Sequence, residues 1–125
     1  MNAKDSKLRQ LDYVEHMLEA IRLVRSYVQG MSRDAFFSDK KTQQAVVLNI
    51  LIIGEAAAQI GKEYPEWANR HPEVPWRAMR GMRNRLAHGY FDINLELVWD
   101  TVHGPLLELQ SQLLRVLSAG SAAEK

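Results

Sequence analysis

The segment between residues 45 and 60 constrains the fold most, because it is apolar around nearly the whole circumference of a helix. It reads AVVLNILIIGEAAAQI. A helix that is apolar on all sides is buried on all sides. In a chain of 125 residues it is therefore either the central helix of a bundle or a helix that also faces a second subunit. We expect Ser38 or Asp39 to cap this helix and Gly61 to end it.

Helical periodicity also covers the N-terminal part of the chain. Its apolar residues recur at three- and four-residue steps, which predicts a helix over residues 6–29 with Gly30 as its C-cap. We expect residues 30–41 to connect this helix to the apolar one and to bring Phe36 and Phe37 into the core.

Prolines and a cap mark the helices of the C-terminal half. Pro65 and Pro75 can each open a short helix, and the second of these is expected to run to about Ala87. Asn94 can cap the last helix. We expect Pro105 to kink that helix, because proline disrupts the hydrogen bonding of a helix interior.

These patterns predict an all-α fold, a bundle of four main helices with additional short ones. Residues 1–125 contain no strand pattern, no repeat and no linker long enough to divide the chain, so we expect a single domain. The last residues, 119–125, are expected to form a disordered tail.

Composition excludes several kinds of chemistry. The chain has no cysteine, which excludes disulfides, thiolate nucleophiles and cysteine-ligated zinc. Its four histidines lack the spacing of metal ligands, and no Gly-rich phosphate loop is present, so we expect neither a metal nor a cofactor. The N-terminus lacks the apolar region of a signal peptide, and polar residues interrupt the longest apolar segment. We therefore expect a cytoplasmic protein without a membrane span.

Positive charge is concentrated in one short segment. The net charge is only +1, from 16 basic and 15 acidic residues. No acid occurs between Glu73 and Asp92. Such a patch suits a phosphate-bearing partner, although a charge cluster alone is more often a solvated face paired with local acids. The segment contains four arginines within nine positions: Arg77, Arg80, Arg83 and Arg85.

Arg83 and His88 supply two of the parts needed to cleave RNA without a metal ion. The arginine fork matches phosphate oxygens, and histidine moves a proton near neutral pH. His88 can take the proton from a ribose 2′-OH, Arg83 can stabilise charge on the phosphorane, and Asn84 can orient either group. Five residues along a helix correspond to about 140° of rotation. The two side chains therefore converge only if the helix ends near Ala87 or if two chains pool their residues.

Glu55 is a carboxylate inside the apolar segment, where burial without a partner would be unfavourable. Two interpretations remain open. The more common situation is a structural partner for a buried arginine or for a backbone amide. The other is a residue that positions an active-site arginine.

The run RNRLAHGY at residues 83–90 matches an R-x4-H-x-Y pattern and resembles the HepT-like toxins of the HEPN (higher eukaryotes and prokaryotes nucleotide-binding) superfamily. The resemblance extends to IIGEAA at residues 52–57, PW at residues 75–76 and YFDIN…VW at residues 90–99. It covers nearly the whole chain, apart from the first few residues and the tail.

This resemblance implies a HEPN-type helical bundle that acts as a metal-independent endoribonuclease, the toxin of a type VII-like toxin–antitoxin pair. It also implies a homodimer in which the Arg83 and His88 motifs of two chains meet in a cleft. Asn84 carries over as the polar residue after the arginine. Tyr90 matches the tyrosine to which a cognate minimal nucleotidyltransferase antitoxin adds AMP.

The expected substrate is RNA, either tRNA or mRNA, and the remaining arginines of the basic segment are expected to bind its phosphates. Two alternatives stay open at this point. One is a non-catalytic HEPN subunit that binds RNA or a nucleotide and partners a nucleotidyltransferase. The other is a structural helical module whose arginines are surface charge. The expected phosphate-binding residues are Arg77, Arg80 and Arg85.

Overall fold

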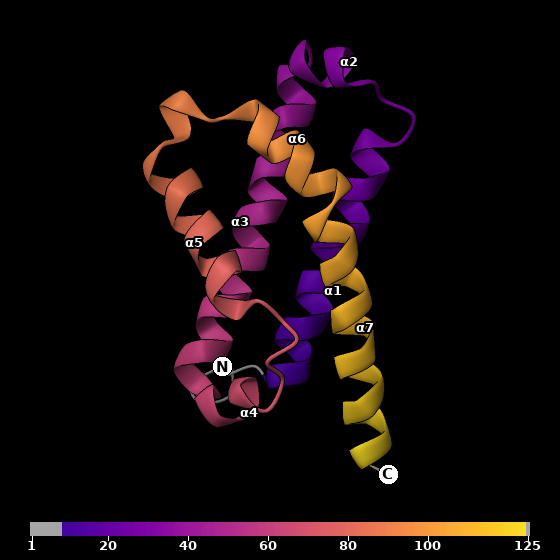
Figure 1. Cartoon of the computed structure of the whole chain (residues 1–125), viewed down its shortest axis with the longest axis vertical. Coiled ribbons are helices and arrows are strands. Elements are labelled where there is room, and N and C mark those ends of the chain that lie inside the picture. The colour runs from indigo at the N-terminus through magenta and orange to yellow at the C-terminus, as the bar shows by residue number, and fades with distance from the viewer. Residues whose placement is uncertain (1–8, 125) are drawn as a thin grey trace, which may run out of the picture.

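A computed structural model describes residues 9–124, with only the backbone described for Tyr90 and residues 121–124. Within this range the chain forms seven α-helices, one short 3₁₀ helix and no strand (Figure 1). The predicted all-α fold is therefore confirmed. In chain order the elements are α1 (Gln10–Val28), α2 (Arg33–Phe37), α3 (Lys40–Glu63), α4 (Pro65–Asn69), α5 (Trp76–His88), η1 (Tyr90–Asp92), α6 (Leu95–His103) and α7 (Pro105–Glu124).

The apolar helix α3 is the central element. It packs along α1 and along α5, while α2 and α4 lie near its two ends (Figure 1). The last helix, α7, packs against α1 and α6. By length and composition α3 could also cross a membrane, but half of its most apolar window is buried inside this fold. Such burial is typical of the core helix of a bundle.

Aliphatic side chains of α1 and α3 form most of the core. They recur at three- and four-residue steps, so each helix turns one apolar stripe towards the other. Asn49 is a polar residue of α3 within this buried set, and its side-chain amide donates to the carbonyl of Ala45 at 2.9 Å. The buried residues of α1 are Val14, Met17, Ala20, Ile21, Val24 and Val28.

One strip of α3 stays uncovered. Leu48 and Ile52 are 57% and 40% exposed, and the side chain of Glu55 is 57% exposed. Residues at these three- and four-residue steps lie on one side of a helix. We call Leu48, Ile52 and Glu55 the α3 strip. The central helix is thus not buried on every side within one chain, and Glu55 is not the buried carboxylate that the sequence suggested.

Three predicted helix ends are confirmed. Asp39 caps α3, because its Oδ1 accepts a hydrogen bond from the backbone N–H of Thr42 at 3.1 Å. Asn94 caps α6 in the same way, accepting from the N–H of Leu97 at 3.0 Å. Gly30 lies just beyond α1 with a φ of +73°, the left-handed conformation that glycine adopts readily. The first residues of the predicted N-terminal helix lie outside the described residues.

The connection after α1 contains a helix that the sequence pattern did not predict. Residues Arg33–Phe37 form α2, which Ser32 caps by accepting from the N–H of Ala35 at 3.0 Å. A helix of five residues is too short to show a period in the sequence. Phe36 is fully buried, as expected, and its ring lies 5.4 Å from that of Trp99.

Two further helix boundaries differ from the prediction. Helix α3 does not end at Gly61 but continues to Glu63, because this glycine serves the packing of α5 and does not form a C-cap. The predicted kink at Pro105 is a complete break at Gly104, which separates α6 from α7. Proline lacks the N–H that would continue the ladder, and its ring clashes with the preceding turn.

The C-terminal segment expected to be disordered is helical as far as Glu124. Its alanines favour a helix, and the segment also rests on α1. A Cβ atom on Gly120 would lie 2.9 Å from Cδ1 of Leu11, so the glycine lets α7 approach α1 closely.

Candidate active site

Two glycines of α3 face α5, and Gly54 determines how closely the two helices approach. A Cβ atom on Gly54 would lie 2.8 Å from the carbonyl oxygen of Met79 and still closer to Cβ of Arg83. A Cβ atom on Gly61 would lie 2.9 Å from Nη1 of Arg80. Sequence reasoning missed this role. The available signal was a pair of glycines seven residues apart within a long apolar helix, a spacing that places both on one face.

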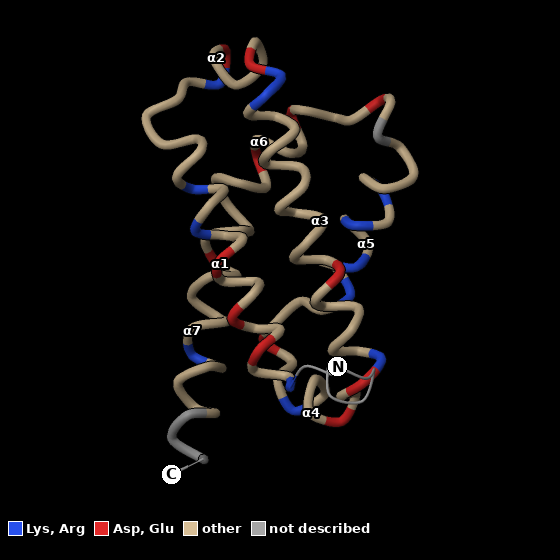
Figure 2. Tube along the Cα trace, turned by 180° about the vertical axis from the view of Figure 1, so that it is seen from behind, with Lys and Arg blue, Asp and Glu red and all other residues tan. Residues whose placement is uncertain are grey.

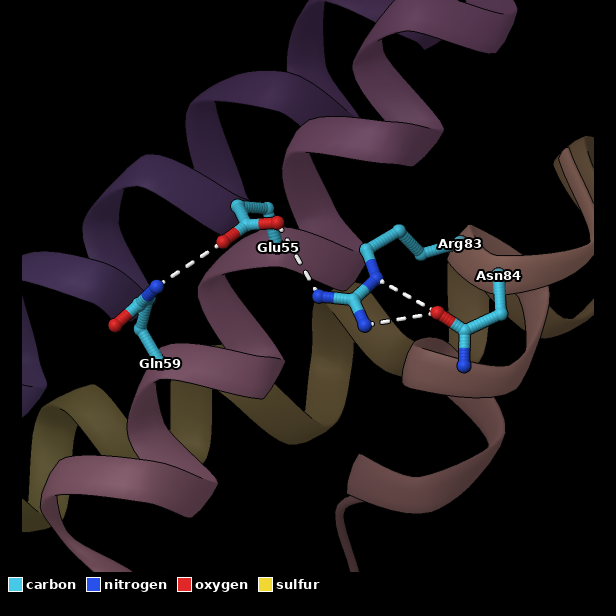
Figure 3. Close-up of polar contacts among 4 residues, drawn as sticks. All are labelled: Glu55, Gln59, Arg83 and Asn84. Carbon is cyan, nitrogen blue, oxygen red and sulfur yellow. Dashed lines mark hydrogen bonds and ion pairs between the residues drawn. The ribbon is translucent and has the colours of Figure 1, made fainter. Parts of the chain in front are cut away.

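The guanidinium of Arg83 is held from two sides (Figure 3). Its Nη1 donates to Oε1 of Glu55 at 3.2 Å, and Nε and Nη2 donate to Oδ1 of Asn84 at 3.1 and 2.8 Å. The side chain keeps 26% of its surface exposed. Because these bonds engage only part of the five N–H donors of a guanidinium, Arg83 is fixed in orientation and can still bind an anion.

Glu55 bridges α3 and α5 on the open side of the site. Its Oε2 accepts a hydrogen bond from Nε2 of Gln59 at 3.1 Å, while Oε1 pairs with Arg83 (Figure 3). Both carboxylate oxygens are therefore engaged. Since the partner arginine is accessible to solvent, the contact fits a positioning role better than a buried structural pair. Gln59 was not expected here.

His88 is the last residue of α5, and Gly89 ends the helix by donating its N–H to the carbonyl of Arg85 at 3.0 Å. Helix α5 thus contains both Arg83 and His88, so the two residues lie about 140° apart around it, and close convergence of the two groups would need the second chain that the sequence analysis allowed for. Both side chains line one open pocket of about 470 Å³ between α3 and α5. The other lining residues are Leu51, Ile52, Glu55, Asn84 and Ala87.

Basic positions recur along α5 (Figure 2), and helical geometry distributes the remaining arginines around it. Three-residue steps drift by about 60° each on an α-helix, so Arg77 lies about 120° around α5 from Arg83, and it is exposed. Arg80 lies against α3 beside Gly61. Arg85 is exposed as well, on the part of α5 that lines a groove towards α6 and α7. Arg77 and Arg85 are thus available to a ligand, whereas Arg80 is partly used for packing.

Tyr90 begins η1, two positions after His88. Its side chain lies outside the described part of the chain. The following residue, Phe91, is 91% exposed, so the segment directly after the site is accessible to a partner. Within residues 9–124, no group of three or more histidine and acidic side chains is placed to hold a metal ion.

The pocket therefore combines an oriented cation, an exposed imidazole and a carboxylate that holds the cation. A guanidinium of this kind can bind a phosphate and stabilise negative charge that develops on it. An imidazole within the same pocket can accept or donate a proton near neutral pH. Together these groups are suited to acid–base chemistry on a phosphodiester.

Comparison with known proteins points to one family. A family model described as Ribonuclease HepT-like matches residues 17–116. A probable ribonuclease HepT of Thermococcus cleftensis is 38% identical over 101 residues, which cover 81% of this chain and 89% of that protein.

A second relative, provisionally named an RNase, comes from Caldanaerobacter subterraneus subsp. tengcongensis. It is 35% identical over 105 residues, which cover 84% of this chain and 91% of the relative. No solved structure gives a significant match. The match of the family model over most of the chain, together with these relatives, shows that the chain belongs to the HepT-like ribonuclease family.

Proposed function

We propose that this chain is a cytoplasmic, homodimeric toxin that cleaves RNA at the pocket of Arg83 and His88 without a metal ion. The observation that carries the proposal is the guanidinium of Arg83, which Glu55 and Asn84 hold at a pocket that His88 also lines. Membership of a ribonuclease family supports the class of reaction.

In the proposed reaction, the imidazole of His88 accepts the proton of a ribose 2′-OH, and the 2′ oxygen attacks the adjacent phosphorus. The P–O5′ bond then breaks, which gives a 2′,3′-cyclic phosphate and a 5′-hydroxyl. The leaving 5′ oxygen takes a proton from the imidazolium of the second copy. Arg83 stabilises the additional negative charge on the five-coordinate phosphorus, and Glu55 and Asn84 act as positioning residues for Arg83.

A second copy of the chain would cover the exposed apolar residues beside the pocket. Leu48 and Ile52 of the α3 strip are large and exposed, and Ile52 also lines the pocket. Removing such apolar surface from water is favourable by about 25 cal/mol per Å². A two-fold contact along this strip would bring two copies of Arg83 and His88 to one cleft, which supports the homodimer.

The proposed partner is a minimal nucleotidyltransferase antitoxin that adds AMP to Tyr90. The position of Tyr90, two residues after His88 and next to an exposed segment, supports this assignment. AMP at this position would add bulk and negative charge beside a cationic site. Both effects oppose binding of an RNA phosphate.

The catalytic proposal is tested by incubating the purified protein with tRNA or total RNA in the presence of EDTA. We expect cleavage that leaves 2′,3′-cyclic phosphate ends. His88→Ala and Arg83→Ala should each lower the rate by about a thousandfold, because each removes a proton-transfer or charge-stabilising group.

Matched controls separate catalysis from general damage. His16→Ala and Arg115→Ala change exposed residues of α1 and α7, and should leave the rate unchanged. Loss of wild-type cleavage on addition of EDTA would contradict the metal-free mechanism. Cleavage that survives both Arg83→Ala and His88→Ala would show that the site is elsewhere.

The dimer and the modification have separate tests. Light scattering should give the mass of a dimer for the wild type and of a monomer for Ile52→Asp. A wild-type monomer at micromolar concentration would contradict the shared cleft. Co-expression with the cognate nucleotidyltransferase should add the mass of AMP to the wild type and not to Tyr90→Phe, and modification elsewhere would overturn the assignment.

A further inference from the structure

Gly81 lies in the middle of α5, and no close contact with a neighbouring atom requires a glycine at this position. Within the described part of the chain, a Cβ atom on Gly81 would meet nothing within 4 Å. By contrast, a Cβ atom on Gly54 would meet the carbonyl oxygen of Met79 at 2.8 Å, and one on Gly61 would meet Nη1 of Arg80 at 2.9 Å. Glycine inside a helix is less stable than alanine. Packing therefore accounts for the two glycines of α3 and not for Gly81.

Gly81 shares one face of α5 with Arg77, Arg85 and His88, and we call these four residues the outer strip. Around the helix axis, Gly81, Arg85 and His88 are rotated from Arg77 by about 40°, 80° and 20°. Arg77, Arg85 and His88 are all exposed. The strip is about 16 Å long, from the number of residues and the helical rise. It ends at the pocket that His88 lines.

The two arginines of the outer strip have no acidic partner. Within residues 9–124, neither Arg77 nor Arg85 forms a side-chain hydrogen bond or ion pair. Arg83, on another face of the same helix, is bound by Glu55. The outer strip therefore presents two unpaired cations on either side of an open glycine, in a helix that contains no acidic residue.

We propose that the RNA strand cleaved at the pocket continues along the outer strip, and that its sugar–phosphate backbone comes against α5 at Gly81. This inference rests on the proposed function, because it assumes an RNA substrate. Arg77 and Arg85 bind phosphates on either side of the glycine. The absence of a Cβ atom lets the backbone approach the helix closely enough for both arginines to reach it.

Gly81 also borders a second feature, an apolar groove of about 430 Å³ between α5 and the α6–α7 pair. An apolar ligand or a protein partner in this groove would also pass close to Gly81. The unpaired arginines favour a polyanion instead, since an apolar occupant gives them no counter-charge. The two possibilities are separated by the experiments below.

The central test is Gly81→Ala, for which the proposal predicts effects of opposite sign on stability and binding. Alanine should raise Tm by a few degrees, because it favours the helix and meets no neighbour. It should weaken binding of a single-stranded 2′-O-methyl RNA by about fivefold, because the methyl group stands between the two arginines. The modified RNA cannot be cleaved through its 2′ oxygen, so binding is measured independently of catalysis.

Two comparisons sharpen the test. Ser118→Ala on the exposed side of α7 improves helix propensity far from the strip, and should leave RNA binding unchanged. Arg77→Ala and Arg85→Ala should each reduce the salt dependence of binding, by a slope of about 0.7 for each phosphate of a single strand that the variant no longer binds. Arg115→Ala should not change that slope.

The outcomes are distinguishable. Unchanged or tighter RNA binding by Gly81→Ala, at a raised Tm, would overturn the proposal. A lowered Tm would mean that the glycine is structural, and a changed oligomeric mass would mean that it faces a protein; either result would also overturn the proposal. If the wild type binds RNA with the expected pattern and yet does not cleave unmodified RNA, the proposed catalysis fails while the outer strip stands.

Discussion

The contact between α3 and α1 and the contact between α3 and α5 differ in the residues that form them. Aliphatic side chains fill the first, and residues such as Val14, Ile21 and Val24 are completely buried there. Helix α5 has only two buried side chains, Met79 and Leu86. Its close approach depends on a glycine of α3, and an exposed ion pair bridges the same contact.

This difference separates the residues that stabilise the fold from those that form the site. Stability is concentrated where apolar surface is buried, and functional elements are commonly less well embedded. Helix α5 keeps its charged side chains accessible, so little surface remains for it to bury. We therefore expect substitutions between α1 and α3 to lower the free energy of unfolding, and substitutions between α3 and α5 to lower activity.

The largest expected change in stability comes from Ile21→Ala in α1. Removal of a fully buried isoleucine side chain should lower the free energy of unfolding by about 3 kcal/mol, as cavity-forming substitutions do. The folded protein should keep its kcat, because α1 does not line the site. Chemical denaturation and single-turnover cleavage at 25 °C measure the two quantities.

Glu15→Ala is the matched control, since Glu15 lies on the exposed side of the same helix and should change stability by less than about 0.5 kcal/mol. If the kcat of Ile21→Ala falls by more than its unfolded fraction accounts for, the proposed difference between the two contacts is contradicted. It would show that the α1–α3 contact also shapes the site.

Gly54→Ala tests the contact between α3 and α5, and it should lower both the stability and the activity. The new methyl group would meet the Met79 carbonyl oxygen at 2.8 Å, and a backbone atom cannot move without moving α5. We expect a loss of about 2 kcal/mol of stability from overpacking. A fall in kcat/KM of about tenfold or more is expected from displacement of Arg83.

Gly61→Ala provides a control on the same face of α3. Its methyl group would meet only the end of the flexible Arg80 side chain, at 2.9 Å, which can rotate away. This variant should retain most of its stability and activity. If both alanine variants lose stability and activity equally, the glycines are needed for the short distance between α3 and α5 in general and not for the position of Arg83.

Glu55→Gln should produce a smaller change, confined to activity. The side chain is 57% exposed, and an ion pair so accessible to solvent contributes little to stability, less than about 1 kcal/mol. Loss of its charge should lower kcat by about threefold to tenfold, because a neutral amide oxygen holds the Arg83 guanidinium less firmly than a carboxylate does. Glu55→Asp should recover part of this loss. If kcat is unchanged, the pair has no positioning role.

The sequence was sufficient to predict most of the fold, because long periodic segments and caps such as Asp39 and Asn94 are local signals. Helix α2 was not predicted, because it depends on the burial of Phe36 between distant elements and not on a periodic pattern of apolar residues. The end of α3 was misplaced because glycine is a common helix terminator. Gly61 instead serves a contact that only the folded chain brings together.

The site was partly predictable for the same reason. The motif names Arg83 and His88 directly, and the end of α5 at Gly89 follows from local sequence. The exposure of Glu55 does not, since it depends on which side of α3 the other helices leave uncovered. That choice is made by tertiary packing, which periodicity cannot reveal in a helix that is apolar on nearly all sides.

The smallest expected effect concerns the cap of the core helix. Hydrogen bonds from Thr42 lower the pKa of Asp39 below its ordinary value. A carboxyl group whose pKa is lowered by folding stabilises the folded state above its unfolded pKa of about 3.9, and this contribution is lost as the pH falls through the lower folded pKa. Tm of the wild type should therefore fall as the pH decreases from about 5 to 2.

In Asp39→Asn this decrease should be shallower, because asparagine still accepts the bond from Thr42 but does not titrate. It should not vanish, since a hydrogen bond from Arg22 also lowers the pKa of Glu19. The cap of α6 supplies the matched comparison. Asn94 is already neutral, so Asn94→Ala should lower Tm by a similar amount at every pH. A pH dependence of Tm in Asp39→Asn identical to that of the wild type would mean that the α3 cap carries no charge-dependent stability.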